Sequence, residues 1–266
     1  MEAENRWAEL GWRHPLWNLL RFYLSITGKN RQKSWKDRLL AQQEVQINKD
    51  ESLPVSSSVV DLLFEYLEER ERLFETTSCK LRDEETALKF CHDNNIPVGT
   101  TSTQNKDHHQ ASKAMIACVS NIAIRVCKEY GVTIDDDPQK RCIWCQNNEL
   151  HVTARNLDGA VPGLVNPFVI WEIKEYWGKT KGGSKMSDAV YECHLVGLEL
   201  LDYTTRSGHN INHIVFLDGK EQWGHRKSDM KRFIDLMNQG LIQYLIIGQE
   251  VEDIWEPLLK KIIKER

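Results

Sequence analysis

The sequence changes in character near Gly131, and this change limits the folds available to the chain. Before this glycine, apolar residues recur at helical spacing, whereas after it short apolar runs alternate with helical patterns. The helices that we predict in the first part cover residues 5–27 with a break at His14-Pro15, 31–47, 59–76, 83–94 and 108–130. The pattern predicts a helical N-terminal region followed by a part that also contains strands.

The second part predicts a mixed sheet with helices on its faces. We expect strands at 142–144, 150–157, 168–174, 211–217 and 241–247, and helices at 185–203, 227–238 and 251–264. The resulting order, β-β-β-α-β-α-β-α, is typical of an α/β (α+β) fold. We therefore predict two regions, a helical region over residues 1–107 and a core over residues 108–266.

Composition and charge narrow the setting in which such a chain works. No run approaches the roughly 18 apolar residues that span a bilayer, and the acidic start of the chain lacks the features of a secretory signal. The seven cysteines are odd in number and irregularly spaced, which argues against a disulfide framework. We therefore expect a cytoplasmic protein. The net charge of −4 counts only weakly against nucleic-acid binding, because acidic metal ligands can offset a local basic surface.

Cys142 and Cys145 form a Cys-x-x-Cys pair. A closed zinc site needs four ligands, and the available partners, His151, His108 and His109, do not have the usual spacing. We favour two partly buried thiols and keep a structural zinc site as the alternative.

The run Phe168–Lys174 is apolar and β-branched apart from two charged residues, Glu172 and Lys174. Because side chains alternate along a strand, these two project from the same face. A carboxylate and an ammonium group within an apolar strand are costly unless they have partners. Asp158, which we place in a turn with Gly159 after the preceding strand, approaches Glu172 if the two strands are neighbours.

Two converging carboxylates suit a hard divalent cation such as Mg²⁺. The expected ligands are Asp158, Glu172 and the backbone carbonyl of Ile173. The ion would polarise a phosphate and lower the pKa of a bound water, and Lys174 would orient or deprotonate that water or stabilise developing negative charge. This chemistry predicts hydrolysis of a phosphodiester, with Asp158, Glu172 and Lys174 as the catalytic residues.

The pattern Asp158-x13-Glu172-Ile173-Lys174, on a β-hairpin followed by a helix, resembles the PD-(D/E)XK nuclease superfamily over residues 110–250. Many type II restriction endonucleases have this fold. The resemblance implies a restriction-endonuclease-like mixed sheet flanked by helices, metal binding by both acids, catalysis by the lysine, and Mg²⁺ that Mn²⁺ can replace. The family often has proline before its first acid, and this chain has Leu157 there.

The same resemblance implies a site-specific endonuclease acting on double-stranded DNA. Such enzymes usually act as homodimers, because a two-fold protein suits a palindromic site. One catalytic half of an enzyme with two different subunits is the alternative. The helical region over residues 1–107 would then supply DNA contacts or a subunit interface.

Further residues are candidates for supporting roles. Glu192, on the helix after the strand, and Glu129, at the end of the helix before the sheet, are possible accessory acids, and a solvated glutamate is the alternative for each. The loop Gly178–Lys185 combines glycines with lysines, which suits contact with phosphates. The candidate DNA-binding residues there are Lys179, Lys181 and Lys185, and an exposed flexible loop is the alternative.

Two other functions fit the same residues. One is an antiphage or repair nuclease with loose sequence preference. The other is a non-catalytic module that binds nucleic acid or another partner, in which the acids serve structure.

Overall fold

The computed structural model describes residues 5–26, 28–46, 51–100, 111–146, 149–178 and 184–266. At its centre is a five-stranded sheet in the order β3-β6-β7-β8-β9. Its strands are β3 (Asp135–Lys140), β6 (Leu157–Val161), β7 (Val169–Glu175), β8 (Asn212–Asp218) and β9 (Tyr244–Ile247). The β3, β6 and β7 neighbours are antiparallel, whereas β7, β8 and β9 are parallel. The predicted mixed sheet of an α/β (α+β) fold is confirmed.

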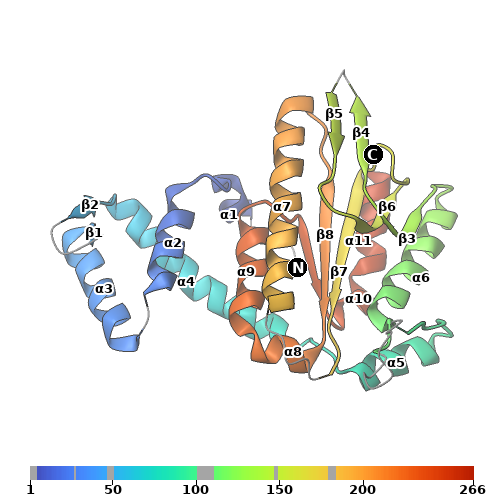
Figure 1. The fold of residues 1–266 in the computed structure, drawn as a ribbon, viewed down its shortest axis with the longest axis horizontal. Helices are drawn as coiled ribbons and strands as arrows, with labels where there is room; N and C mark the ends of the chain where they lie inside the picture. The colour runs from blue at the N-terminus through green and yellow to red at the C-terminus, as the bar shows by residue number, and fades with distance from the viewer. Residues whose placement is uncertain (1–4, 27, 47–50, 101–110, 147–148, 179–183) are drawn as a thin grey trace.

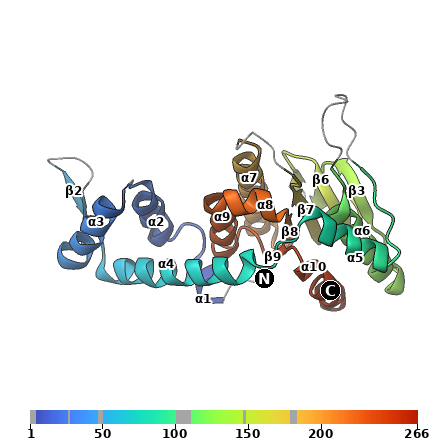
Figure 2. The same ribbon diagram turned by 90° about the horizontal axis from the view of Figure 1, so that it is seen from below.

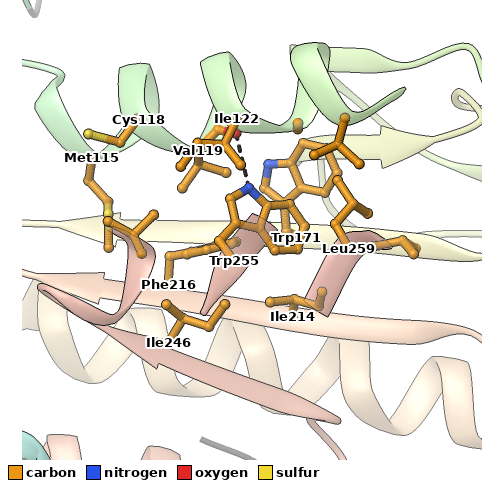
Figure 3. Close-up of a cluster of buried hydrophobic side chains, with 14 of the residues drawn as sticks. Met115, Cys118, Val119, Ile122, Trp171, Ile214, Phe216, Ile246, Trp255 and Leu259 are labelled. Atoms are coloured by element: carbon orange, nitrogen blue, oxygen red, sulfur yellow. Dashed lines mark hydrogen bonds between the residues drawn. The ribbon is translucent and has the colours of Figure 1, made fainter. Parts of the chain in front are cut away.

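One face of the sheet is covered by α6 (Ala114–Glu129), α10 (Glu250–Asp253) and α11 (Trp255–Lys264). Alternation along the strands sends Trp171 and Phe216 to this face. The Trp255 ring lies 5.7 Å from Trp171 and 5.1 Å from Phe216, both edge to face. The Trp255 indole also donates a hydrogen bond of 3.1 Å to the Val119 carbonyl of α6, as Figure 3 shows. This apolar cluster packs α6 and α11 against the middle of the sheet.

The other face is covered by α7 (Ser184–Ser207), α8 (Lys220–His225) and α9 (Lys227–Asn238), so the core has three layers (Figure 1). Ile170 and Val215 point toward this side. Gly197 allows α7 to lie close to the segment between α9 and β9, because a Cβ at this position would meet the Leu241 carbonyl oxygen at 2.5 Å. Residues of α7 share buried clusters with Ile170 of β7 and Val215 of β8, so the helix that follows β7 packs against these two strands.

The N-terminal helices form a second, smaller cluster beside the core. They are α1 (Asn5–Leu10), α2 (Pro15–Ser25), α3 (Lys29–Gln42) and α4 (Ser57–Ser78). Trp7 and Trp17 both meet the Tyr66 ring edge to face at 5.0 Å. Figure 2 shows α4 running from this cluster to the core. There Arg70 of α4 binds the Asp235 carboxylate of α9 through two hydrogen bonds, of 2.6 and 2.8 Å. Next, α5 (Glu84–Asp93) packs in the same cluster as α6.

Several element boundaries differ from the sequence prediction. The helix predicted over 31–47 ends at Gln42, where Gln43 has a φ of 52°, and a short hairpin of β1 (Glu44–Gln46) and β2 (Ser52–Pro54) follows. Strand β3 was missed because its three aspartates and one proline disfavour strands. It is one of the sheet's two edge strands, and its register shifts between Asp136 and Lys140.

The strand predicted over 150–157 is wrong in a way that affects Asp158. The chain forms a separate hairpin from β4 (Ile143–Gln146) and β5 (Glu149–Val152), and only then enters β6. Asp158 and Gly159, predicted as a turn, lie inside β6. Gly159 is needed there, because a Cβ on it would lie 1.8 Å from the Trp171 ring on the neighbouring strand. The sequence alone therefore does not distinguish a strand glycine that makes room for a neighbouring indole from a glycine in a turn.

Among the described residues, no helix is long and apolar enough to cross a membrane.

Candidate active site

The pairing of β6 with β7 brings Asp158 next to Glu172. The ladder joins Val161 to Val169, Ala160 to Ile170 and Gly159 to Trp171, so the next position along it holds Asp158 opposite Glu172. At this position the contact with β7 is made by the Asp158 side chain and not by its backbone. Its Oδ2 accepts a hydrogen bond of 2.7 Å from the Ile173 N–H. The predicted approach of the two acids depends on this strand pairing, and the pairing is present.

Glu172 lies at the centre of a buried ion network, with only 1% of its surface exposed. Its Oε2 is 2.9 Å from the Lys174 ammonium nitrogen, and its Oε1 is 3.1 Å from His213 Nε2 on β8. Burial alone raises the pKa of the Glu172 carboxyl, but Lys174 and His213 hold it well below its usual range. In turn, burial acts to lower the pKa of Lys174, but Glu172 outweighs that effect and raises it well above normal. Both groups are therefore ionised.

His213 of β8 contacts this network through both of its ring nitrogens. Its Nδ1 lies 3.2 Å from the Leu241 carbonyl oxygen, while its Nε2 faces the ionised Glu172. His213 is not among the residues predicted from the sequence. The available signal is a histidine within the apolar run from Ile211 to Leu217.

Glu192 of α7 extends the network toward the surface. Its Oε2 accepts a hydrogen bond of 3.0 Å from Lys174, and its Oε1 pairs with Arg155 at 2.8 Å. Its side chain is 25% exposed, whereas that of Glu172 is 2% exposed. Charges thus alternate from Glu172 through Lys174 and Glu192 to Arg155. The structure places the candidate accessory residue Glu192 in contact with Lys174.

Asp158 lies on the half-buried side of the site. Its Oδ1 accepts a hydrogen bond of 2.8 Å from the Gln139 amide, which donates at the same distance to Asp137. Burial raises the pKa of the Asp158 carboxyl despite these hydrogen bonds. Gln139 lies on the irregular edge strand β3, whose existence the sequence did not indicate.

The oxygen ligands at the site are of the kind that a hard divalent cation prefers. In the structure, however, the carboxylates are engaged in the ion network and its hydrogen bonds. Asp158 and Glu172 supply carboxylates, and strand geometry turns the Ile173 carbonyl to the same side as its N–H, which binds Asp158. Both Glu172 oxygens are engaged by Lys174 and His213. In the part of the chain that the structure describes, no three His, Cys, Asp or Glu side chains form a metal-binding group. Cation binding would require Glu172 to exchange one of its partners.

Comparison with known proteins gives a family and no activity. The profile of a family described as a domain of unknown function (DUF7687) matches residues 68–262, nearly three quarters of the chain. The chain belongs to this family. No curated protein and no solved structure matches it. The matched region contains every residue of the ion network, from Arg155 to His213.

The structure does not bring Glu129, the other candidate accessory acid, into the ion network. Its carboxylate pairs with Lys260 of α11 at 2.8 Å. The other end of α6 faces the C-terminal end of β7, where the Met115 N–H donates to Glu175. The length of α6, about 1.5 Å per residue, separates Glu129 from that end.

Of the remaining candidates, some are described by the structure and others lie outside the described residues. Lys185 lies with its ammonium group 5.1 Å from the centre of the Tyr176 ring, whereas Lys179 and Lys181 lie outside the described residues. Cys142 is buried and Cys145 is exposed, and burial raises the pKa of the Cys142 thiol to about 12. His108 and His109 also lie outside the described residues.

Proposed function

We propose that the chain is a Mg²⁺-dependent nuclease of the PD-(D/E)XK kind that hydrolyses phosphodiester bonds in DNA. The observation that supports this best is the position of Asp158 opposite Glu172, with Lys174 held against Glu172 on the same strand. Buried charges in an apolar sheet cost stability, and such groups are concentrated at functional sites. In its finer form, the proposal is a site-specific double-strand endonuclease of the type II restriction kind, working as a homodimer or with a second subunit.

Asp158, Glu172 and the Ile173 carbonyl would hold the cation, which Mn²⁺ could replace. When bound, Mg²⁺ supplies charge stabilisation at the phosphate and acidifies a coordinated water. A nearby cation would also reverse the raised pKa of Asp158, because burial disfavours its charged form only while that charge is uncompensated. The unusual state of this carboxyl therefore agrees with a role as a metal ligand.

Lys174 acts as a fixed positive charge in this proposal. Glu172 raises the pKa of its ammonium group, so the side chain keeps its proton at neutral pH. A protonated lysine stabilises negative charge that develops on the phosphate and cannot remove a proton from water. Of the roles that the sequence allowed, charge stabilisation is thus favoured over that of a general base. Glu192 and His213 position the pair, since each contacts one member of it.

The test is cleavage of plasmid and linear DNA by the purified chain with MgCl₂, MnCl₂ or EDTA. We expect cleavage that needs the metal, and a loss of about 10²–10³-fold or more in Glu172→Gln and Lys174→Met, because each removes a charge from the reaction site. Discrete fragments would support site-specific cleavage, and a smear would support a nuclease with loose preference.

Glu129→Gln is the matched control, because it removes a carboxylate of the same domain that lies outside the network. It should cleave like the wild type. Urea unfolding of each variant separates loss of the fold from loss of chemistry. Full activity in Lys174→Met would overturn the site assignment, and no cleavage by the folded wild type with either metal would favour a non-catalytic nucleic-acid-binding module.

A further inference from the structure

A groove of about 720 Å³ separates the N-terminal helix α2 from α7 and α9 of the core. Figure 2 shows α2 facing these two helices. The groove contains apolar side chains, among them Leu24 and Tyr191, which are 41% and 59% exposed. It also contains a basic group from each of the three helices, namely Arg21, His194 and Arg232.

These basic groups are incompletely neutralised. Among the described residues, no carboxylate pairs with Arg21, and His194 Nε2 is buried without a hydrogen-bond partner. The Arg232 guanidinium lies 4.6 Å from the centre of the Tyr191 ring, with the Asp229 carboxylate 3.4 Å from its Nη1. A buried ring nitrogen without a partner costs free energy that an incoming acceptor would recover.

The two acids of the groove form their shorter ion pairs with cations outside this basic group. Asp235 is held by two hydrogen bonds from Arg70, and Asp229 forms a 2.6 Å ion pair with Arg226. These carboxylates therefore neutralise little of the positive charge of the group formed by Arg21, His194 and Arg232. The pKa of His194 is lowered first by burial and then by Arg21 and Arg232, which is the response of an imidazole in a positive environment.

The groove and the candidate active site lie on opposite flanks of one helix. Glu192 and His194 are two residues apart on α7, so they project about 200° apart around its axis. Glu192 contacts Lys174, and His194 lines the groove. Between these flanks, Tyr191 and Leu195 are exposed on the outer surface of α7. A helix is about 10 Å wide, so one extended ligand can cross it and reach both places.

We propose that this groove binds a phosphate of the nucleic-acid substrate, with Arg21, His194 and Arg232 as the binding group. The inference rests on the proposed function, since it names the contact that holds the strand on the far flank of α7. Guanidinium groups bind phosphate oxygens through paired hydrogen bonds, and the His194 ring supplies a further polar contact. The N-terminal helical region would thereby contribute to substrate binding through Arg21.

The test measures binding of a labelled DNA duplex by fluorescence anisotropy in EDTA, where cleavage does not interfere. Relative to wild type, the double variant Arg21→Ala/Arg232→Ala should bind at least about 10-fold more weakly near 0.1 M salt. The slope of log K against log [NaCl] should become shallower by about one, because the groove binds one phosphate and each phosphate contact contributes roughly 0.9. The change should be the same for unrelated duplexes, since phosphate contacts are independent of sequence.

Arg125→Ala is the matched control, because this arginine is exposed and paired with Glu256 on the other side of the core. It should bind DNA like the wild type. Unchanged affinity and salt slope in the double variant would overturn the inference, as would a wild type that binds no DNA. Binding of inorganic phosphate alone, with no effect of the double variant on DNA affinity, would assign the groove to a free anion and also overturn it. DNA binding that depends on the two arginines without any cleavage would overturn the proposed nuclease while supporting the groove.

Discussion

The core contains two buried centres of charge on neighbouring strands, and they differ in how completely they are enclosed. The first joins Arg82, which precedes α5, to Asp218 at the end of β8 and to Glu252 of α10 at 2.7 and 2.8 Å. The side chains of Arg82 and Asp218 are both 0% exposed. This centre fastens the segment after α4 to the sheet. Every charge in it has a fixed structural partner.

The second centre is the network around Glu172 and Lys174, which opens toward the surface through Glu192 and Asp158. Its outer acids are half-buried, and the pKa of Asp158 is raised by burial. The comparison shows that a buried ion pair alone does not identify a functional site. Each network ends in an acid whose side chain is 25% exposed, Glu252 in the first and Glu192 in the second. The second differs in holding Asp158 beside it, an acid that forms no ion pair among the described residues.

The largest expected effect tests the enclosed centre. Arg82→Ala should lower the free energy of unfolding by about 3–5 kcal/mol, because it leaves Asp218 buried without its cation. Lys174→Met should cost less, about 1–3 kcal/mol, since Glu172 keeps His213 and Glu192 keeps Arg155. Urea unfolding of the two variants measures both values. Equal losses would mean that the two centres are structurally equivalent and would remove the distinction drawn between them.

The sequence predicted the parts of the site that depend on alternation within one strand. Glu172 and Lys174 share a face of β7 because they are two residues apart, and this needs no knowledge of neighbours. The mixed sheet followed in the same way from the order of apolar runs. For Glu192, the helical pattern gives its face of the helix and not its contact with Lys174.

The rest depends on contacts between segments that the local pattern does not record. His213 reaches Glu172 only because β8 lies beside β7. Gln139 reaches Asp158 from a strand whose residues, including Pro138, disfavour strand structure. Gly159 was interpreted as a turn residue because the sequence does not show that the Trp171 ring occupies the space of its missing side chain.

A second prediction concerns Glu175, which lies on β7 between the two centres. Burial, its first cause, raises the pKa of its carboxyl to about 8, and its Oε2 accepts the Met115 N–H at 2.8 Å. The folded state therefore binds the proton more tightly than the unfolded state, so Glu175 lowers stability as pH rises from about 4.5 toward 8. Relative to wild type, Glu175→Gln should become steadily more stable across this range.

Unfolding midpoints in urea at several pH values would measure that difference. Glu256→Gln is the control of opposite sign, because hydrogen bonds from Arg125 and Lys260 lower the pKa of Glu256. Its stability relative to wild type should fall as the pH rises. A difference between Glu175→Gln and wild type that stays constant with pH would contradict the prediction.

The smallest effect is expected at Asp158, and it separates the two centres by sign. Because burial raises the pKa of this carboxyl, its charged form destabilises the fold once the pH exceeds the unfolded value of about 4. Asp158→Asn keeps an oxygen for the Ile173 N–H and should match or exceed wild-type stability at pH 7 by up to about 1 kcal/mol. Burial also raises the pKa of the Asp218 carboxyl, but Asp218→Asn leaves the buried Arg82 without its anionic partner and should therefore destabilise. If Asp158→Asn lowered stability as Asp218→Asn does, the Asp158 carboxylate would be needed for the fold. That result would contradict the view that Asp158 lowers stability and serves ligand binding instead.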